Sequence, residues 1–313
     1  MLVVAGVYSM KRKKEPISKA KKPLSDKRLM MVSMVFIVVI VLGFMLFRIF
    51  MSTPEVEFSF NAAIIDQQGE ESPNPDFNET GVVANTLKNA GFSVTYHRSE
   101  TINVSFYKGL AKYNYGIIIL RTHSALREGG TMVDFFTSEE FSEYKYVSEQ
   151  DDDLLTRGHY PWKPDKFYFA ITPKFIENLE GYFPKSIIIA MGCWSLKPTC
   201  EEMAEAFIKK GAKAYIGWTD TVGVSHSDDS AVRFLQYWLV NNMTISEALY
   251  ECNKIPDFEF PWVSTKLSYY PLAIGDYKLS NLTMKVVLNK FQWTSQANLS
   301  SKNKKLNRLK IAA

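Results

Sequence analysis

Short β-rich runs alternate with helical patterns through the middle of the chain. The runs lie at 62–65, 92–96, 115–120, 187–191 and 214–218. Helical patterns fall between and after them, at about 80–90, 101–113, 199–211, 227–240 and 245–253. Continuous Ile, Val and Leu runs separated by helices are typical of a parallel sheet that is covered on both faces. The pattern therefore predicts an α/β fold with a mostly parallel sheet.

Signals for the ends of helices support this arrangement. Thr199 and Glu202 have the spacing of a capping box, and Gly211 stands where a left-handed residue ends a helix. Thr172 before Pro173 predicts another helix start. The run from 186 to 218 is thus expected to be one strand–helix–strand unit.

Later segments differ in their regularity. Thr244 and Glu247 form a second capping-box pattern. The segment 125–168 has no clear periodicity and is expected to be irregular, with short strands as an alternative at Met132–Phe136 and Phe167–Ala170. The region 256–290 is richer in Pro and aromatic residues, so it is also expected to be irregular, with a final strand near Met284–Leu288.

The N-terminal region has a different composition. Nine Lys or Arg lie between Lys11 and Arg28, and the following 29–47 contains no charged residue. An uncharged run of this length can cross a bilayer as a helix, and flanking basic residues stay in the cytoplasm. We expect a basic cytoplasmic tail (1–28), a transmembrane helix (29–50) and a tether (51–60). A cleaved signal peptide is the alternative, but the basic region is too long for one.

This topology places a domain at 61–290 outside the cytoplasm, anchored to the cell membrane, with a polar basic tail at 291–313. The formal net charge of the chain is +4. The N-terminal tail alone carries more positive charge than this, so the remainder is acidic on balance. That distribution disfavours a nucleic-acid partner for the folded part.

The three cysteines do not form a disulfide framework. Cys200 and Cys252 align with apolar residues at helical spacing, which predicts small core side chains. Only Cys193 lies outside such a face. No zinc-ligand spacing, phosphate-binding loop or dinucleotide fingerprint is present in the sequence, so neither a metal nor a cofactor is expected.

Two of the predicted strands end in residues suited to nucleophilic catalysis. His123 follows the run 115–120, and Cys193 follows the run 187–191. At the ends of neighbouring parallel strands, about 5 Å apart, their side chains would be within reach. A thiol with a nearby base can attack a carbonyl carbon and form an acyl-enzyme. Backbone N–H groups around Gly192 and Ser124 could then bind the oxyanion. The alternative is a buried cysteine and an unrelated loop histidine.

The order of several motifs resembles the caspase-like fold of clan CD cysteine peptidases, the group of caspases, gingipains, separases and CHAT domains. The resemblance spans roughly 60–280 and rests on IIILRTHSA, IIIAMGC, EEMAEAFIKKGAKAYIGWTDTV, DDSAVRFLQYWLVNNMTISEALYECNK and PLAIGDYKL. It implies a three-layer α/β/α sandwich, a Cys193/His123 dyad and a peptide or protein substrate. Two positions depart from the family pattern. Ser124 stands where the family has Gly after the His, and Trp194 stands where a small or polar residue often follows the Cys.

Other residues near the expected strand ends are weaker candidates for a functional role. Asp220 and Trp194 could line a substrate pocket, although Asp220 also suits a turn. His97 and His159 are read as surface or loop histidines, and so is His226, which is the best substitute base. The Asp151–Asp153 run is read as a solvated acidic loop, with Ca²⁺ or a basic substrate side chain as the alternative ligand.

Three hypotheses follow for the function. The first is a membrane-anchored cysteine endopeptidase that uses Cys193 and His123. The second is a catalytically silent caspase-like domain that serves as a surface binding or scaffold module. The third is an unrelated flavodoxin-like binding domain in which Cys193 is merely packed.

Overall fold

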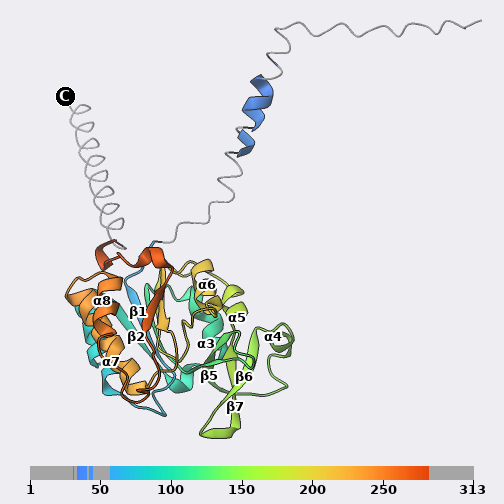
Figure 1. Ribbon diagram of the computed structural model, residues 1–313. Coiled ribbons are helices and arrows are strands. Elements are labelled where there is room, and N and C mark those ends of the chain that lie inside the picture. The colour runs from blue at the N-terminus through green and yellow to red at the C-terminus, as the bar shows by residue number, and fades with distance from the viewer. Residues whose placement is uncertain (1–30, 32–33, 41, 45–56, 282–313) are drawn as a thin grey trace, which may run out of the picture. The chain divides into compact units, whose positions relative to one another are not determined.

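The structure is a computed structural model that describes residue 31 and the ranges 34–40, 42–44 and 57–281 (Figure 1). The chain divides into two units, Met1–Glu55 and Val56–Ala313. Much of the predicted span 29–50 and all of the predicted strand near 284–288 and tail 291–313 lie outside the described residues. Within the ranges that are described, no helix is long and apolar enough to cross a membrane.

A six-stranded sheet forms the centre of the second unit, in the order β10-β9-β8-β3-β1-β2. The strands from β1 to β9 in this sheet run parallel, and β10 pairs antiparallel with β9. This confirms the predicted α/β class with a mostly parallel sheet. The bounds are β1 Asn61–Asp66, β2 Ser93–Arg98, β3 Ile117–Arg121, β8 Ile187–Ala190, β9 Ala214–Trp218 and β10 Leu267–Tyr270.

Helices cover both faces of this sheet because its strands are apolar on both sides. Ile117 and Ile119 of β3 join the core beneath α2, α7 and α8, whereas Ile118 and Leu120 join the core beneath α3, α5 and α6. Figure 1 shows the two groups of helices on opposite sides. The bounds are α2 Val82–Asn89, α3 Val104–Gly109, α5 Pro173–Glu177, α6 Glu202–Lys209, α7 Val224–Leu235 and α8 Ile245–Cys252.

Shorter helical segments make up the rest of the helical structure in the range 57–281. Helix α4 spans Val147–Asp151, and a π-helical turn at Gln236–Val240 continues α7. Four 3₁₀ turns lie at Pro75–Phe77, Ser99–Thr101, Leu110–Lys112 and Leu272–Ile274.

The segment 125–168 is more regular than expected and forms most of a second, antiparallel sheet in the order β4-β5-β7-β6. Its strands are β4 Ser124–Leu126, β5 Val133–Glu140, β6 Leu155–Tyr160 and β7 Lys163–Ile171. The short strand suggested at 132–136 overlaps β5, and the one at 167–170 lies within β7. The first half of β7 is exposed and partly charged, so only its second half shows an apolar run. The buried half of the sheet joins the main core through Phe135, Phe169 and Ile171.

Three of the predicted helix ends are confirmed and one is wrong. Thr172 accepts a hydrogen bond from the Phe175 amide, the capping box at Thr244 is complete, and Gly211 has a φ of +102°. The box at Thr199 is wrong. Helix α6 begins at Glu202, and Thr199 has a φ of +73°, whereas an N-cap residue needs extended backbone.

The region 256–290 was also expected to be irregular before its final strand, but it contains a further strand. Within it, the four residues Leu267–Tyr270 form β10, which pairs antiparallel with β9. Only Leu267 of this strand is buried, so the strand has no continuous apolar run. It is stabilised by its pairing with β9 rather than by a local pattern.

Candidate active site

His123 and Cys193 lie at the same level beyond two neighbouring strands. Leu120 of β3 pairs with Ala190 of β8, and each candidate residue follows its strand partner by three positions. Both side chains line the same two cavities at this edge of the sheet. The predicted adjacency of these two strands is therefore confirmed, and the register of the parallel pair brings the residues to one edge.

The two cavities share His123, Cys193, Val222 and Val224. The smaller one reaches down between the strand ends to Arg121 and is just large enough for water. The larger one has a volume of about 500 Å³ and lies between the second sheet and the loops that follow β8 and β9. A cavity of this size can hold an amino-acid side chain.

The Cys193 side chain is partly buried. Its Sγ atom donates a hydrogen bond to the Val222 carbonyl oxygen at 3.5 Å. Burial raises the pKa of the Cys193 thiol above its ordinary value, and the nearby Asp257 and Asp220 carboxylates act in the same direction. At neutral pH the resting group is therefore the thiol rather than the thiolate.

The His123 ring is enclosed by aromatic side chains from the second sheet. Its centroid lies 4.7 Å from that of Tyr160 and 5.6 Å from that of Trp162. Burial lowers the pKa of His123 to about 4, while the charge of Glu71 raises it in part. The imidazole is therefore neutral at physiological pH, which is the form that can accept a proton.

Glu71 is the acidic partner of this histidine. Its Oε2 atom lies 3.9 Å from His123 Nε2, and Lys163 holds its other oxygen. Within the described part of the chain, neither Nε2 of His123 nor Oε2 of Glu71 has a hydrogen-bond partner. Two buried polar atoms thus face each other, and a protonated ring would be stabilised by the carboxylate.

Ser124 and Gly192 bring the two strand ends into close contact. The Ser124 hydroxyl donates to the Cys193 carbonyl oxygen at 2.6 Å. A Cβ atom at Gly192 would lie 2.6 Å from the Thr122 carbonyl oxygen and 2.9 Å from the Ser124 amide nitrogen. Glycine is therefore required for this approach of the two backbones.

Trp194 and Asp220 form a second contact next to Cys193. Trp194 has a φ of +55° and lines the larger cavity. Its indole Nε1 donates to Asp220 Oδ1, which also accepts from the Thr221 amide, and the Trp194 amide donates to the Asp220 carbonyl oxygen. The Asp220 carboxylate is thus committed to the loop, and Asp220 is not among the residues that line either cavity.

A buried ion cluster, missed at the sequence level, supports this edge of the sheet. Arg121, only 1% exposed, binds Asp228 with two hydrogen bonds and Asp66 with a third. Asp228 also accepts from the side chain of Asn74. The cluster joins β1, β3 and α7 directly beneath the candidate site. The sequence signal is an arginine that immediately follows the apolar run 115–120.

The remaining histidines and cysteines have structural contacts. His97 bonds the Tyr115 hydroxyl, and His226 packs against Trp218. His159 lies at the rim of the larger cavity. Cys200 and Cys252 are buried, which confirms the prediction that they are core residues.

The acidic run Asp151–Asp153 ends helix α4, and Asp153 pairs with Arg127. Among the described residues, no group of three or more His, Cys, Asp or Glu side chains is arranged to hold a metal ion.

No protein-family model matches the chain, and no curated protein matches it either. The evidence for function therefore comes from the geometry and chemistry of the site.

Proposed function

We propose that this protein is a cysteine peptidase with a caspase-like fold, in which Cys193 is the nucleophile and His123 is the general base. The observation that carries the proposal is the matched register of the two residues. They follow Leu120 and Ala190 by the same number of positions and line the same cavities. The motif order at the sequence level and the helices on both faces of the sheet support the caspase-like class.

The proposed mechanism starts from a neutral pair. As the Cys193 sulfur attacks the carbonyl carbon of a peptide bond, the thiol proton passes to the His123 ring. The C–N bond then breaks, and the imidazolium returns that proton to the leaving amine. Water, deprotonated by His123, hydrolyses the resulting thioester and restores both groups.

Glu71 has a defined part in this scheme. Because its carboxylate faces Nε2 of His123, it favours the imidazolium that forms during the attack. Nδ1 is then the ring atom left to accept the thiol proton. Glu71 acts through the histidine and is therefore a positioning residue.

The oxyanion would be bound by backbone N–H groups at the contact between Ser124 and Gly192. These two residues hold the turns after β3 and β8 against each other. The Trp194 amide already donates to Asp220, so it is a poorer candidate. Preorganised amides in a closed site stabilise the developing negative charge strongly.

We further propose that the enzyme is anchored in the cell membrane by 29–50, with its catalytic domain outside the cytoplasm. The support is the uncharged run 29–47 and the basic cluster that precedes it. No nucleic acid, metal or cofactor takes part in the proposed reaction.

A second candidate is a catalytically silent domain that binds a partner. The observation that favours it is the hydrogen bond from Cys193 Sγ to Val222, together with a thiol pKa raised by burial. A thiol held in this way is a weak nucleophile until something displaces the bond.

Labelling of the full-length chain in detergent separates the two candidates. A peptidyl acyloxymethyl ketone should label Cys193 much faster than iodoacetamide does, because binding aligns the thiol with the base. The labelling should vanish in Cys193→Ala and slow at least tenfold in His123→Ala. Cys200→Ala and Cys252→Ala are matched controls that remove a buried thiol and should label normally. Labelling that is no faster than that of a free thiol, and indifferent to His123, would favour the silent domain.

A further inference from the structure

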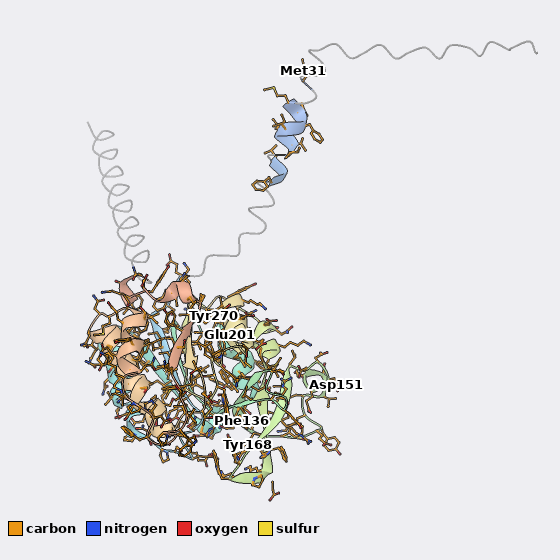
Figure 2. All side chains as sticks on the ribbon, viewed as in Figure 1. Met31, Phe136, Asp151, Tyr168, Glu201 and Tyr270 are labelled. Atoms are coloured by element: carbon orange, nitrogen blue, oxygen red, sulfur yellow. The ribbon has the colours of Figure 1, made fainter. Side chains whose placement is uncertain are left out.

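The larger cavity beside the candidate dyad has mostly apolar walls. Phe136, Tyr160 and Trp162 come from the second sheet, where Figure 2 labels Phe136. Trp194 and Phe260 come from the loops that follow β8 and α8. The Tyr160 ring is stacked on Trp162 at a centroid distance of 5.2 Å and on Phe136 at 5.0 Å. The aromatic wall is therefore held in place by its own packing.

The charge of the cavity lining is low. Among the described residues that line it, none is Lys or Arg, and Glu259 is the one acidic residue. Its Oε1 atom accepts a hydrogen bond from the Ser225 amide at 3.0 Å, in the first turn of α7. The neighbouring Asp257 accepts from the Gly223 amide in the same way. Both carboxylates are thus engaged by the start of the helix, where acidic groups are favoured.

Apolar residues lie on both sides of the cavity: the aromatic wall contacts His123, and a second group lies beside the nucleophile. Trp194 follows Cys193 directly, and the Val222 carbonyl oxygen accepts the hydrogen bond from the Cys193 sulfur. Val224 and Phe260 complete this side of the cavity. In the acyl-enzyme the acyl part of the substrate stays on the sulfur. The side chain next to the attacked carbonyl is therefore the one that this region would receive.

Resting on the peptidase function proposed above, we infer that the enzyme selects a large apolar residue, aromatic above all, on the acyl side of the cleaved bond. An acidic side chain would find neither Lys nor Arg among the described residues of this lining. A basic side chain would find only a carboxylate that already accepts a hydrogen bond from the α7 backbone. Burial of an unpaired charge is costly, whereas packing of a ring against Trp194 and Phe260 is favourable.

A probe panel tests this directly. Acyloxymethyl ketones that differ only in the residue next to the reactive group (Phe, Leu, Glu or Lys) are reacted with the full chain in detergent. Probes with Phe or Leu should label Cys193 at least tenfold faster than those with Glu or Lys. A peptide library cut by the wild type and not by Cys193→Ala should show the same residues before the cleaved bond.

Two variants of one loop provide a matched pair. Phe260→Lys places a cation in the cavity, so labelling by the Phe probe should fall at least tenfold and labelling by the Glu probe should rise. Phe258→Lys makes the same change two residues earlier, at a side chain that is 78% exposed and does not line the cavity. It should leave the order of the probes unchanged.

The outcomes distinguish a failure of the proposed specificity from a failure of the proposed peptidase function. His123-dependent labelling that is fastest with Glu or Lys would overturn the specificity and leave the peptidase function standing. Equal rates for all four probes would also overturn it. No His123-dependent labelling by any probe would reject the peptidase function and the specificity together.

Discussion

The Nε2 atom of His123 lies 3.9 Å from the Oε2 atom of Glu71, although the two residues come from loops after different strands. Lys163, at the start of β7, holds the other Glu71 oxygen. The base of the proposed dyad is thus linked to both sheets. The pair also gives the site a measurable electrostatic signature, because Glu71 and Lys163 act on the pKa of His123 in opposite directions.

Glu71→Gln should lower the pKa of His123, and Lys163→Ala should raise it. The first change removes the charge that favours the imidazolium, and the second removes one that opposes it. Titration of the His123 imidazole by NMR measures both shifts independently of activity. Shifts in the same direction for the two variants would contradict the assigned contacts.

Glu71→Gln should also affect catalysis. If Glu71 stabilises the imidazolium, Glu71→Gln should reduce kcat about tenfold or more with little change in KM, since one pKa unit corresponds to a tenfold effect. Glu71→Asp should recover part of the loss. A kcat that stays at the wild-type value would show that Glu71 only fills space.

Acid should destabilise the wild type partly through His123. The folded pKa is about 4, below the ordinary value of 6.5, so the unfolded chain binds a proton that the folded chain excludes. The stability from this group is present above pH 6.5 and is lost as the pH falls toward 4, by up to roughly 3 kcal/mol. Urea unfolding of wild type and His123→Phe measures it. The difference in unfolding free energy should be constant from pH 7 to 8 and should shift in favour of the variant below pH 6.5. A constant difference down to pH 4 would refute this assignment.

Arg121→Met should be strongly destabilising. It leaves Asp66 and Asp228 buried without their cation, a loss of about 3–5 kcal/mol for buried pairs. The control is Lys209→Ala, which breaks an ion pair with Glu177 whose side chains are 62% and 39% exposed. Such surface pairs contribute about 0–1 kcal/mol. Denaturant unfolding compares the two variants. Similar decreases in unfolding free energy would mean that the buried cluster stabilises the protein no more than a surface ion pair does.

Thr199→Gly should stabilise the protein. Thr199 is exposed and has a φ of +73°, which is strained for a β-branched residue. Relief of this strain is expected to contribute about 1 kcal/mol. Thr199→Ala keeps the left-handed backbone without glycine's freedom and should gain less. The melting temperatures of both variants provide the test, and an order of Ala above Gly would argue against strain at this position.

Much of the central sheet can be predicted from local pattern. The first four residues of Ile117–Arg121 are apolar and buried because both faces of the strand are covered, so this part of the sequence alone reports its burial. The same reasoning predicts that the runs ending near His123 and Cys193 are parallel strands. Register then follows from the pairing of Leu120 with Ala190, which only the fold reveals.

Where burial depends on distant partners, the local pattern predicts at most part of a strand, such as 167–170 within β7. The strand Lys163–Ile171 is half exposed, and its pairing with β5 and β6 creates the second sheet. The capping-box pattern at Thr199 was misleading for a related reason. Thr199 lies with a left-handed backbone in a turn that is closed by the hydrogen bond from the Cys200 amide to the Lys197 carbonyl oxygen.

The sequence by itself therefore determined the α/β class, the strands of the parallel sheet and the choice of Cys193 and His123 as the candidate pair. These depend on local periodicity and on the chemistry of single residues. Only the tertiary structure decided that Glu71 faces His123, that Arg121 is neutralised by Asp66 and Asp228, and that an aromatic wall packs against His123. Such contacts join side chains up to about a hundred positions apart. Their formation depends on the packing of whole elements, which no local pattern records.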